Sequence, residues 1–184
     1  MSDDKLVWNV QNSAEVYRSR VFRVLERRAL SPQGNAKTFT VIEAPDWAIV
    51  VPVIDTPGGK HFVMVRQWRH GSRELSLEFP GGVFEPGEDS AAAAARELQE
   101  ETAYAPGKIQ ALGKMSPNPA IMGNHVHFFL AENLRHTGNQ NLDDDEFMAV
   151  ELIPVETVLQ NMGEPPYVHA LMASALALYL QKRL

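Results

Sequence analysis

Three glutamates, Glu97, Glu100 and Glu101, follow a glycine-rich turn and five consecutive alanines in the stretch "FPGGVFEPGEDSAAAAARELQEETAYAPG", residues 79–107. Residues 90–103 contain no glycine or proline and consist mostly of helix-favouring types, so this segment is predicted to be a helix. At about 100° per residue the three carboxylates fall within a wedge of about 100°. Because like charges three and four residues apart repel, the cluster destabilises an isolated helix.

Two interpretations of this cluster remain open on helical geometry alone. Arg96 precedes Glu100 by four residues and offsets part of the repulsion, and a solvated acidic face is the commonest meaning of such a cluster. Clustered carboxylates beside a bending backbone also suit Mg²⁺ or Mn²⁺, which prefer hard oxygen ligands. We expect Ala93 and Ala94, one turn before the glutamates, to keep the approach to the carboxylates open.

The composition is that of a globular protein. The chain has 184 residues, of which 45% are hydrophobic and 22% charged, enough for one domain with a small appendage. No apolar run approaches the roughly 20 residues that a membrane-spanning helix needs, and the N-terminal "MSDDKLVWNV" lacks the apolar core of a secretory signal. The absence of cysteine excludes disulfides, zinc–thiolate sites and thiol nucleophiles, and it fits a cytoplasmic location.

The net charge restricts the classes of partner. A formal charge of −6 argues against long nucleic acids and anionic membranes, which attract basic proteins. An anionic small molecule stays compatible with this charge, because bound cations reverse the local sign of the field. The expected partner is therefore a small molecule.

The order of predicted elements indicates an α+β fold, arranged as a mixed α/β/α sandwich. Strand-like runs precede the central helix, further strands follow it, and two more helices are predicted near residues 156–162 and 168–184. The runs "WAIVVPVID" and "HFVMVRQWR" are joined by the turn "TPGGK", which predicts a hairpin. Residues 1–45 are predicted to form a strand-rich appendage, and residues 46–184 the main domain.

The glutamate-rich stretch resembles the Nudix box, whose pattern is G-x5-E-x7-R-E-U-x-E-E-x-G-U, where U is a bulky apolar residue. The fixed positions up to the glutamate pair are all filled at the required spacing, by Gly82, Glu88, Arg96, Glu97, Leu98, Glu100 and Glu101. So many fixed positions make the motif specific. Two positions depart from it: Ala103 replaces the second glycine, which puts the helix ending in question, and Tyr104 fills the last apolar position.

The resemblance implies the Nudix fold and the hydrolysis of a nucleoside diphosphate linked to another group, with Mg²⁺ or alternatively Mn²⁺ as cofactor. The metal ligands that it implies are Glu97, Glu101, Glu100 (a further ligand or catalytic helper) and the backbone carbonyl of Gly81. It also implies that Arg96 orients these glutamates and that Glu88 ties the loop to the helix.

Segments outside the box resemble the bacterial ADP-ribose and nucleoside-diphosphate-sugar pyrophosphatases. The likeness is carried by "VRQWR" and "LEFPGG", and it implies that Arg69 contacts a phosphate and that Glu78 lies near the metal cluster. Pro119 stands sixteen residues after the second glycine position of the box, where this subgroup tends to carry a proline. Trp47 and Trp68 either stack on a substrate base or pack in the core or at its rim.

The acidic loop "LDDDEF" has two interpretations. A solvated loop is the default for such a run, but in the resembling enzymes this loop supplies a glutamate that activates the attacking water. Glu146 is the best match, with the aspartates at 143–145 as alternates. His125 and His127 share one face of a predicted strand, but two histidines without a third ligand are poor evidence for zinc, so we expect a structural or substrate-edge role.

The expected activity is Mg²⁺-dependent hydrolysis of the pyrophosphate bond of ADP-ribose or a related nucleoside diphosphate sugar, giving a nucleoside monophosphate and a sugar phosphate. The alternatives are a hydrolase of dinucleoside polyphosphates, capped RNA or coenzyme A derivatives, and a non-catalytic ligand sensor, a class that usually loses the box glutamates. The resemblance also implies a homodimer in which the N-terminal strands of one subunit complete the pocket of the other. The strand-rich residues 1–45 are compatible with that arrangement.

Overall fold

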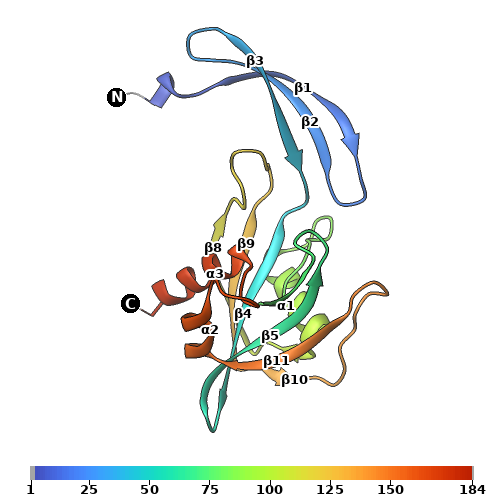
Figure 1. Cartoon of the computed structure of the whole chain (residues 1–184), viewed down its shortest axis with the longest axis vertical. Helices are drawn as coiled ribbons and strands as arrows, with labels where there is room; N and C mark the ends of the chain where they lie inside the picture. The colour runs from blue at the N-terminus through green and yellow to red at the C-terminus, as the bar shows by residue number, and fades with distance from the viewer. Residues whose placement is uncertain (1–2, 184) are drawn as a thin grey trace. The chain divides into compact units, whose positions relative to one another are not determined.

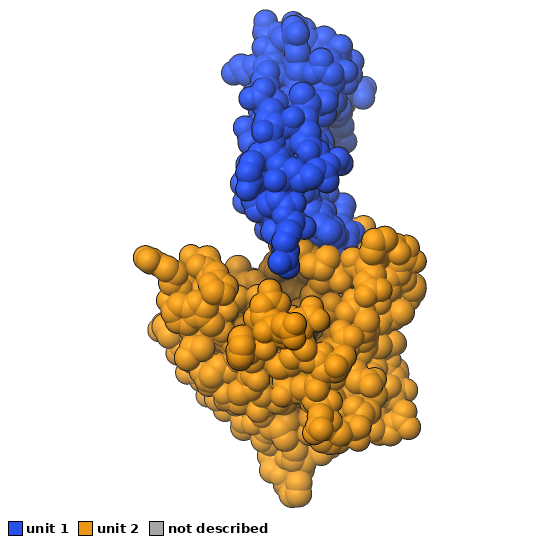
Figure 2. All heavy atoms as spheres, turned by 90° about the vertical axis from the view of Figure 1, so that its right-hand side faces the viewer, with its two compact units in different colours: residues 1–46, 116–125 blue, residues 47–115, 126–184 orange. Residues whose placement is uncertain are grey.

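The computed structural model describes residues 3–183 and divides the chain into two compact units (Figure 2). Unit 1 comprises residues 1–46 and 116–125, and unit 2 comprises residues 47–115 and 126–184. The described elements are mixed sheets with three α-helices, so the predicted α+β class is confirmed. Within residues 3–183, no helix combines the length and the hydropathy that crossing a bilayer requires.

Unit 1 is built on a three-stranded antiparallel sheet in the order β1-β2-β3 (Figure 1). Its elements are a short 3-10 helix η1 (Asp3–Lys5), β1 (Asn9–Arg18), β2 (Arg23–Leu30) and β3 (Ala36–Glu43). The segment 116–125 joins this unit because Met122 forms a bridge with Ile42, and Asn124 donates a hydrogen bond from Nδ2 to the carbonyl of Pro45 at 3.1 Å. The division of the sequence into 1–45 and 46–184, with a dimerising role for the first part, stays a prediction.

Unit 2 contains a six-stranded sheet in the order β11-β5-β4-β9-β8, with β6 paired to β5. The strands are β4 (Trp47–Thr56), β5 (Gly59–Arg69), β6 (Glu74–Glu78), β8 (Lys108–Met115), β9 (Val126–Glu132) and β11 (Met148–Pro154), and a small separate pair is formed by β7 (Tyr104–Ala105) and β10 (Arg135–His136). The predicted hairpin is confirmed, since β4 and β5 pair antiparallel up to Thr56 and Gly59. Among the strands of this sheet, as described within residues 3–183, β4 and β9 are the one parallel pair.

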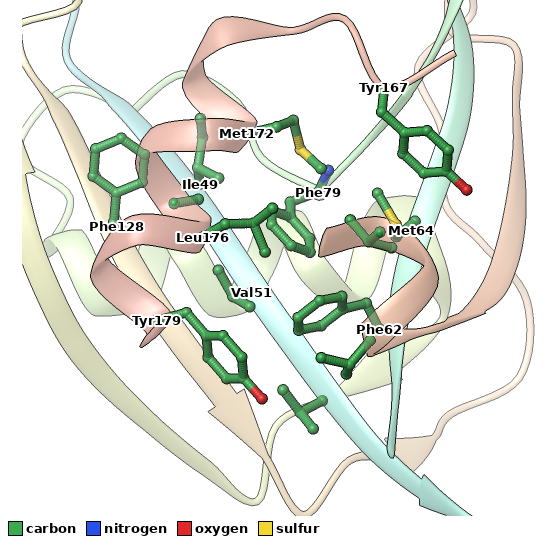
Figure 3. Close-up of a cluster of buried hydrophobic side chains, with 14 of the residues drawn as sticks. Ile49, Val51, Phe62, Met64, Phe79, Phe128, Tyr167, Met172, Leu176 and Tyr179 are labelled. Atoms are coloured by element: carbon green, nitrogen blue, oxygen red, sulfur yellow. The ribbon is translucent and has the colours of Figure 1, made fainter. Parts of the chain in front are cut away.

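Helices cover both faces of this sheet, as the predicted sandwich requires. The helices are α1 (Ser90–Thr102), α2 (Val155–Asn161) and α3 (Ala170–Gln181). Ala48 and Val50 of β4 pack in one buried cluster with α1, whereas Ile49 and Val51 pack in another with α2 and α3. Figure 3 shows that second cluster, with α3 lying across β4. Because both faces of β4 are covered, its residues 47–54 are all apolar and do not alternate with polar ones.

The alanines of α1 have a different role from the one expected. Ala93 and Ala94 are fully buried and pack against Ala48 and Val50 of β4. They therefore do not keep the approach to the carboxylates open, and that expectation is wrong. The small side chains instead allow the helix backbone to come close to the sheet, because larger ones would hold the two elements further apart.

The ends of α1 are defined by two local contacts. The side chain of Asp89 accepts hydrogen bonds from the backbone N–H groups of Ala91 and Ala92, which caps the first turn. At the other end Ala103 has φ 59° and ψ 22°, and its N–H donates to the carbonyl of Gln99. The departure from the box pattern thus leaves a left-handed helix ending in place, on a residue whose Cβ disfavours it by roughly 1–2 kcal/mol.

We expect Ala103→Gly to raise the free energy of unfolding by up to about 1 kcal/mol, since the relief of the left-handed strain exceeds the loss of one buried methyl group. Ala92→Gly is the matched control, because Ala92 is exposed within the same helix and glycine there costs about 1 kcal/mol. Urea titration of both variants measures the difference. A loss in Ala103→Gly equal to that in Ala92→Gly would contradict this account.

Candidate metal and substrate site

Two glycines bring the backbone of residues 79–83 between β4 and α1. Ala48 donates its N–H to the carbonyl of Gly82 at 2.9 Å, so the loop follows the edge of β4. A Cβ on Gly81 would lie 2.1 Å from the carbonyl oxygen of Ala48, and a Cβ on Gly82 would lie 2.5 Å from the carboxylate of Glu97. The contact at Gly81 is with backbone, so only glycine fits there, whereas a side chain at position 82 would displace the carboxylate of Glu97.

Arg96 connects three glutamates around the start of the site. Its Nε and Nη2 donate to the two carboxylate oxygens of Glu88 at 3.0 and 3.1 Å, which ties the preceding loop to the helix. Its Nη1 donates to Glu97 Oε1 at 3.0 Å and to Glu100 Oε2 at 2.9 Å. Arg96 therefore offsets part of the charge repulsion at Glu100, as expected, and the same guanidinium also binds Glu97.

Glu101 is the most deeply buried acid of the cluster. It is 4% exposed, and its Oε2 accepts a hydrogen bond from the N–H of Gly81 at 3.0 Å. Burial raises the pKa of Glu101 to about 8, and the negative charges of Glu97 and Glu146 add to the rise, while the Gly81 hydrogen bond and the charge of Arg69 oppose it. Burial also raises the pKa of Glu97, although Arg96 opposes that rise.

These carboxylates fit a hydrated divalent cation. Within residues 3–183, no three acidic, histidine or cysteine side chains gather closely enough to enclose a metal ion on their own. Mg²⁺ does not require such an enclosure, because it keeps several waters and takes one or two protein carboxylates together with substrate phosphates. Glu97 and Glu101 could supply these oxygens, and burial is the main cause that raises the pKa of both carboxylates.

The loop that carries the acidic run is fastened to the same helix. Gln140 donates from Nε2 to the carbonyl of Glu101 at 2.5 Å, and the N–H of Asn141 donates to the carbonyl of Glu100 at 2.9 Å. Glu146 is half-buried and accepts the N–H of Asp143 at 3.1 Å, whereas the aspartates at 143–145 are exposed. The negative charge of Glu146 contributes to the raised pKa of Glu97 and of Glu101, so its carboxylate lies within electrostatic range of the glutamate cluster.

A second ionic cluster lies beside the glutamates. Arg69 donates from Nε and Nη2 to the two oxygens of Glu78, at 2.9 and 2.6 Å, and His169 Nδ1 lies 2.8 Å from Glu78 Oε2. Glu78 is 2% exposed, and although burial disfavours its charge, the hydrogen bonds from Arg69 and His169 hold its pKa well below the usual range. No motif or periodicity points to His169, which lies 91 residues from Glu78.

A cavity of about 500 Å³ lies next to both clusters within unit 2. Gly81 and Gly82, which contact the buried glutamates, also line this cavity. The residues that line the cavity include Trp47, Arg69, Glu74, Ser76, Leu171 and His169. The position of Trp47 on the cavity wall is compatible with contact to the substrate. That role of Trp47 stays a prediction.

Other candidate residues are not part of this assembly. Pro119 belongs to unit 1, so its role in substrate binding stays a prediction. Trp68 is 48% exposed and does not line the cavity. The ring of His127 packs at 4.9 Å from that of Phe84, and His125 Nδ1 lies 3.8 Å from Asp46, in agreement with structural roles for the two histidines.

Known protein families and proteins resemble this chain over most of its length. The NUDIX domain family matches residues 45–173. The chain is 30% identical over 168 residues to the ADP-ribose pyrophosphatase of Bacillus subtilis (strain 168), covering 91% of this chain and 89% of that protein. It is 25% identical over 173 residues to the ADP compounds hydrolase NudE of Escherichia coli (strain K12), covering 92% and 89% of the two chains.

A solved structure shares the fold. The crystal structure of an ADP compounds hydrolase superposes with a TM-score of 0.83, covering 95% of this chain and 93% of the other. At 24% sequence identity, this likeness bears on the fold alone. It agrees with the sandwich of helices and mixed sheet found in unit 2.

The raised pKa of Glu101 predicts how the stability of the metal-free protein depends on pH. Between about pH 4.5 and 8 the unfolded chain has released the proton of Glu101 while the folded chain retains it, so stability falls as pH rises through this window. We expect Glu101→Gln to remove more than about 1 kcal/mol of this fall. Denaturation with a chelator at pH 4 to 9 measures it, with the exposed Glu164→Gln as control. Parallel profiles for Glu101→Gln and the wild type would contradict the assignment.

Proposed function

This chain belongs to the Nudix family, and we propose that it hydrolyses the pyrophosphate bond of ADP-ribose or a related nucleoside diphosphate sugar, giving a nucleoside monophosphate and a sugar phosphate. The observation that carries the proposal is the pair of carboxylates, the buried Glu101 and the partly buried Glu97, held against the Gly81–Gly82 backbone. The substrate class is supported by the relatives named as an ADP-ribose pyrophosphatase and an ADP compounds hydrolase.

Nudix hydrolases generally need a divalent metal, and we propose Mg²⁺ here, with Mn²⁺ as the alternative. Glu97 and Glu101 would hold it, with Glu100 and the carbonyl of Gly81 as further ligands. When bound, such a cation neutralises phosphate charge and polarises phosphorus. Arg96 keeps the carboxylates of Glu97 and Glu100 in position through its Nη1, because a single guanidinium nitrogen donates to both.

The proposed reaction is an in-line displacement by water at one phosphorus of the diphosphate. Glu146 accepts the proton of this water at Oε1, since its Oε2 already accepts the N–H of Asp143. A new P–O bond forms, the bridging P–O bond breaks, and the leaving phosphate departs with its group. Arg69, whose Nη1 takes part in none of the hydrogen bonds found among residues 3–183, offers this nitrogen to a phosphate oxygen.

We also propose that the protein is a homodimer assembled through unit 1. Of the residues in β1, β2 and β3, only Leu25 and Ala29 are buried. Large apolar side chains remain exposed on or beside these strands, among them Trp8, Val10, Tyr17, Phe22 and Phe39. A small sheet with this much exposed apolar surface needs a further layer for stability, and a second copy of the chain supplies one. A cytoplasmic location stays a prediction.

Replacing a proposed metal ligand is expected to abolish turnover without unfolding the protein. Glu97→Gln and Glu101→Gln should each lower kcat for ADP-ribose by at least about 100-fold, because even residues that merely support a ligand cost 10–100-fold. Release of AMP in the presence of Mg²⁺ measures the loss, and Glu164→Gln is the control. Near-normal turnover by either variant, with an intact melting transition, would refute the proposed site.

The dimer proposal predicts a particle of twice the chain mass of 20.5 kDa in light scattering. Trp8→Ser combined with Phe39→Ser, which removes an edge-to-face ring pair at 5.1 Å, should shift the particle towards the monomer. Lys37→Ser is the matched control, since Lys37 is also exposed on β3. A wild-type protein that remains a monomer at micromolar concentration would overturn the proposal.

A further inference from the structure

Glu78 is held by donors from two different elements. Arg69, the last residue of β5, is paired in register with Glu74, and its side chain extends along β6 to reach Glu78. His169, which precedes α3, contacts Glu78 Oε2 through Nδ1. Although burial disfavours its charge, hydrogen bonding keeps the pKa of Glu78 well below the usual range, so the carboxylate is ionised and can only accept. Nδ1 therefore carries the hydrogen of this contact, and one buried oxygen accepts from both Arg69 and His169.

The residue type at position 169 is not explained by the helix that follows it. His169 is the N-cap residue of α3, and its side chain makes no capping hydrogen bond. Serine, threonine, aspartate and asparagine are preferred at an N-cap, because their side chains accept an N–H group of the first turn. Histidine forgoes that stabilisation, and its ring binds Glu78 instead. A residue that breaks a local rule in this way is typical of a functional site.

The backbone on both sides of Glu78 is fastened to the same segment as the histidine. The N–H of Leu77 donates to the carbonyl of Pro166 at 3.0 Å, and the N–H of Phe79 donates to Met172 Sδ (Figure 3). These contacts join β6 to residues before and after position 169. The separation of the Glu78 carboxylate and the imidazole ring is therefore set by rigid elements, as a positioned site requires.

Arg69 needs an anchor because its side chain is long and lies near the surface. The side chain of Arg69 is 44% exposed, whereas that of Glu78 is 2% exposed. Ordering an exposed arginine costs conformational entropy. The bonds from Nε and Nη2 to the two oxygens of Glu78 restrict the guanidinium and leave Nη1 on its opposite edge. Glu78 can orient Arg69 only as firmly as it is itself held, and His169 is its second support.

We propose that His169 is a positioning residue for the hydrolysis: its Nδ1 fixes the carboxylate of Glu78, which in turn fixes the guanidinium of Arg69 so that Nη1 meets a phosphate oxygen of the substrate. The proposal rests on the proposed function, in which Arg69 contacts the diphosphate. Because His169 and Arg69 share one carboxylate, the guanidinium also attracts an anion more strongly than it would in an isolated ion pair.

The test compares substitutions that keep or remove a donor at the place of Nδ1. The side-chain nitrogen of asparagine is as many bonds from Cα as Nδ1 of histidine, whereas that of glutamine corresponds to Nε2. Binding of the α,β-methylene analogue of ADP-ribose, which is not hydrolysed at the bridge, is measured by calorimetry with Mg²⁺. We expect His169→Leu and His169→Gln each to weaken the analogue by at least about fivefold, and His169→Asn to recover most of that loss. His70→Leu, the same change at an exposed residue beside Arg69, is the matched control and should leave binding unchanged.

A double-mutant cycle determines whether His169 acts through Arg69. Arg69→Ala alone should weaken the analogue by about 10- to 100-fold, since it removes a hydrogen bond from a charged donor. Adding His169→Leu to Arg69→Ala should then change the affinity by less than about twofold, because the group that His169 positions is absent. A role in stability alone would lower the melting temperature of His169→Leu and leave the affinity of the folded protein unaltered.

Melting curves identify a variant that fails to fold. If Arg69→Ala does so, Arg69→Lys takes its place in the cycle, since lysine keeps a positive charge beside Glu78 and lacks the forked donor.

Three results would overturn the positioning role: equal affinity in the wild type and His169→Leu, a loss from His169→Leu that persists at full size in the Arg69→Ala background, or recovery by His169→Gln and not by His169→Asn. The last two would mean that the histidine contacts the ligand itself. A wild type that releases no AMP from ADP-ribose would instead refute the proposed function, so the two failures are distinguishable.

Discussion

The burial of the Glu101 carboxylate is the constraint on which the rest of unit 2 depends. An isolated buried charge is strongly unfavourable, and Glu101 responds with a raised pKa and a single hydrogen bond from Gly81. That bond requires the loop backbone to lie against β4, where only glycine fits. It also requires α1 to lie close to the sheet, which Ala93 and Ala94 permit. The core packing and the reactive site are thus two results of one close approach.

Charge is divided unevenly between the two clusters of the site. Around α1, the single cation Arg96 serves Glu88, Glu97 and Glu100, so the acids outnumber the base. Around Glu78, one buried acid holds both Arg69 and His169. The first cluster needs added positive charge, and the second retains a guanidinium nitrogen for an anion. A magnesium diphosphate carries both complements, which explains how a chain with a net charge of −6 can bind an anionic substrate.

The sequence predicted the elements whose signals are local. The β4–β5 hairpin, the central helix and the α+β class follow from turn residues and periodicity over a few positions. The function of the alanines was misjudged because a helix wheel does not show which side the sheet will cover. The contact of His169 with Glu78 was not predictable, since it joins residues 91 positions apart and no periodicity links them. Likewise, the grouping of residues 116–125 with unit 1 depends on long-range contacts such as that of Ile42 with Met122.

Ala103 shows that the motif requires a backbone conformation at this position rather than a particular residue type. The box pattern has glycine there, and the absence of glycine put the helix ending in question. The structure keeps the left-handed conformation, with the N–H of Ala103 bonded to Gln99 and its carbonyl accepting the N–H of Thr137. These contacts, together with those of Gln140 and Asn141, attach to the end of α1 the loop that carries Glu146. The site therefore requires the backbone direction at this position, and glycine is only the residue that adopts it with least strain.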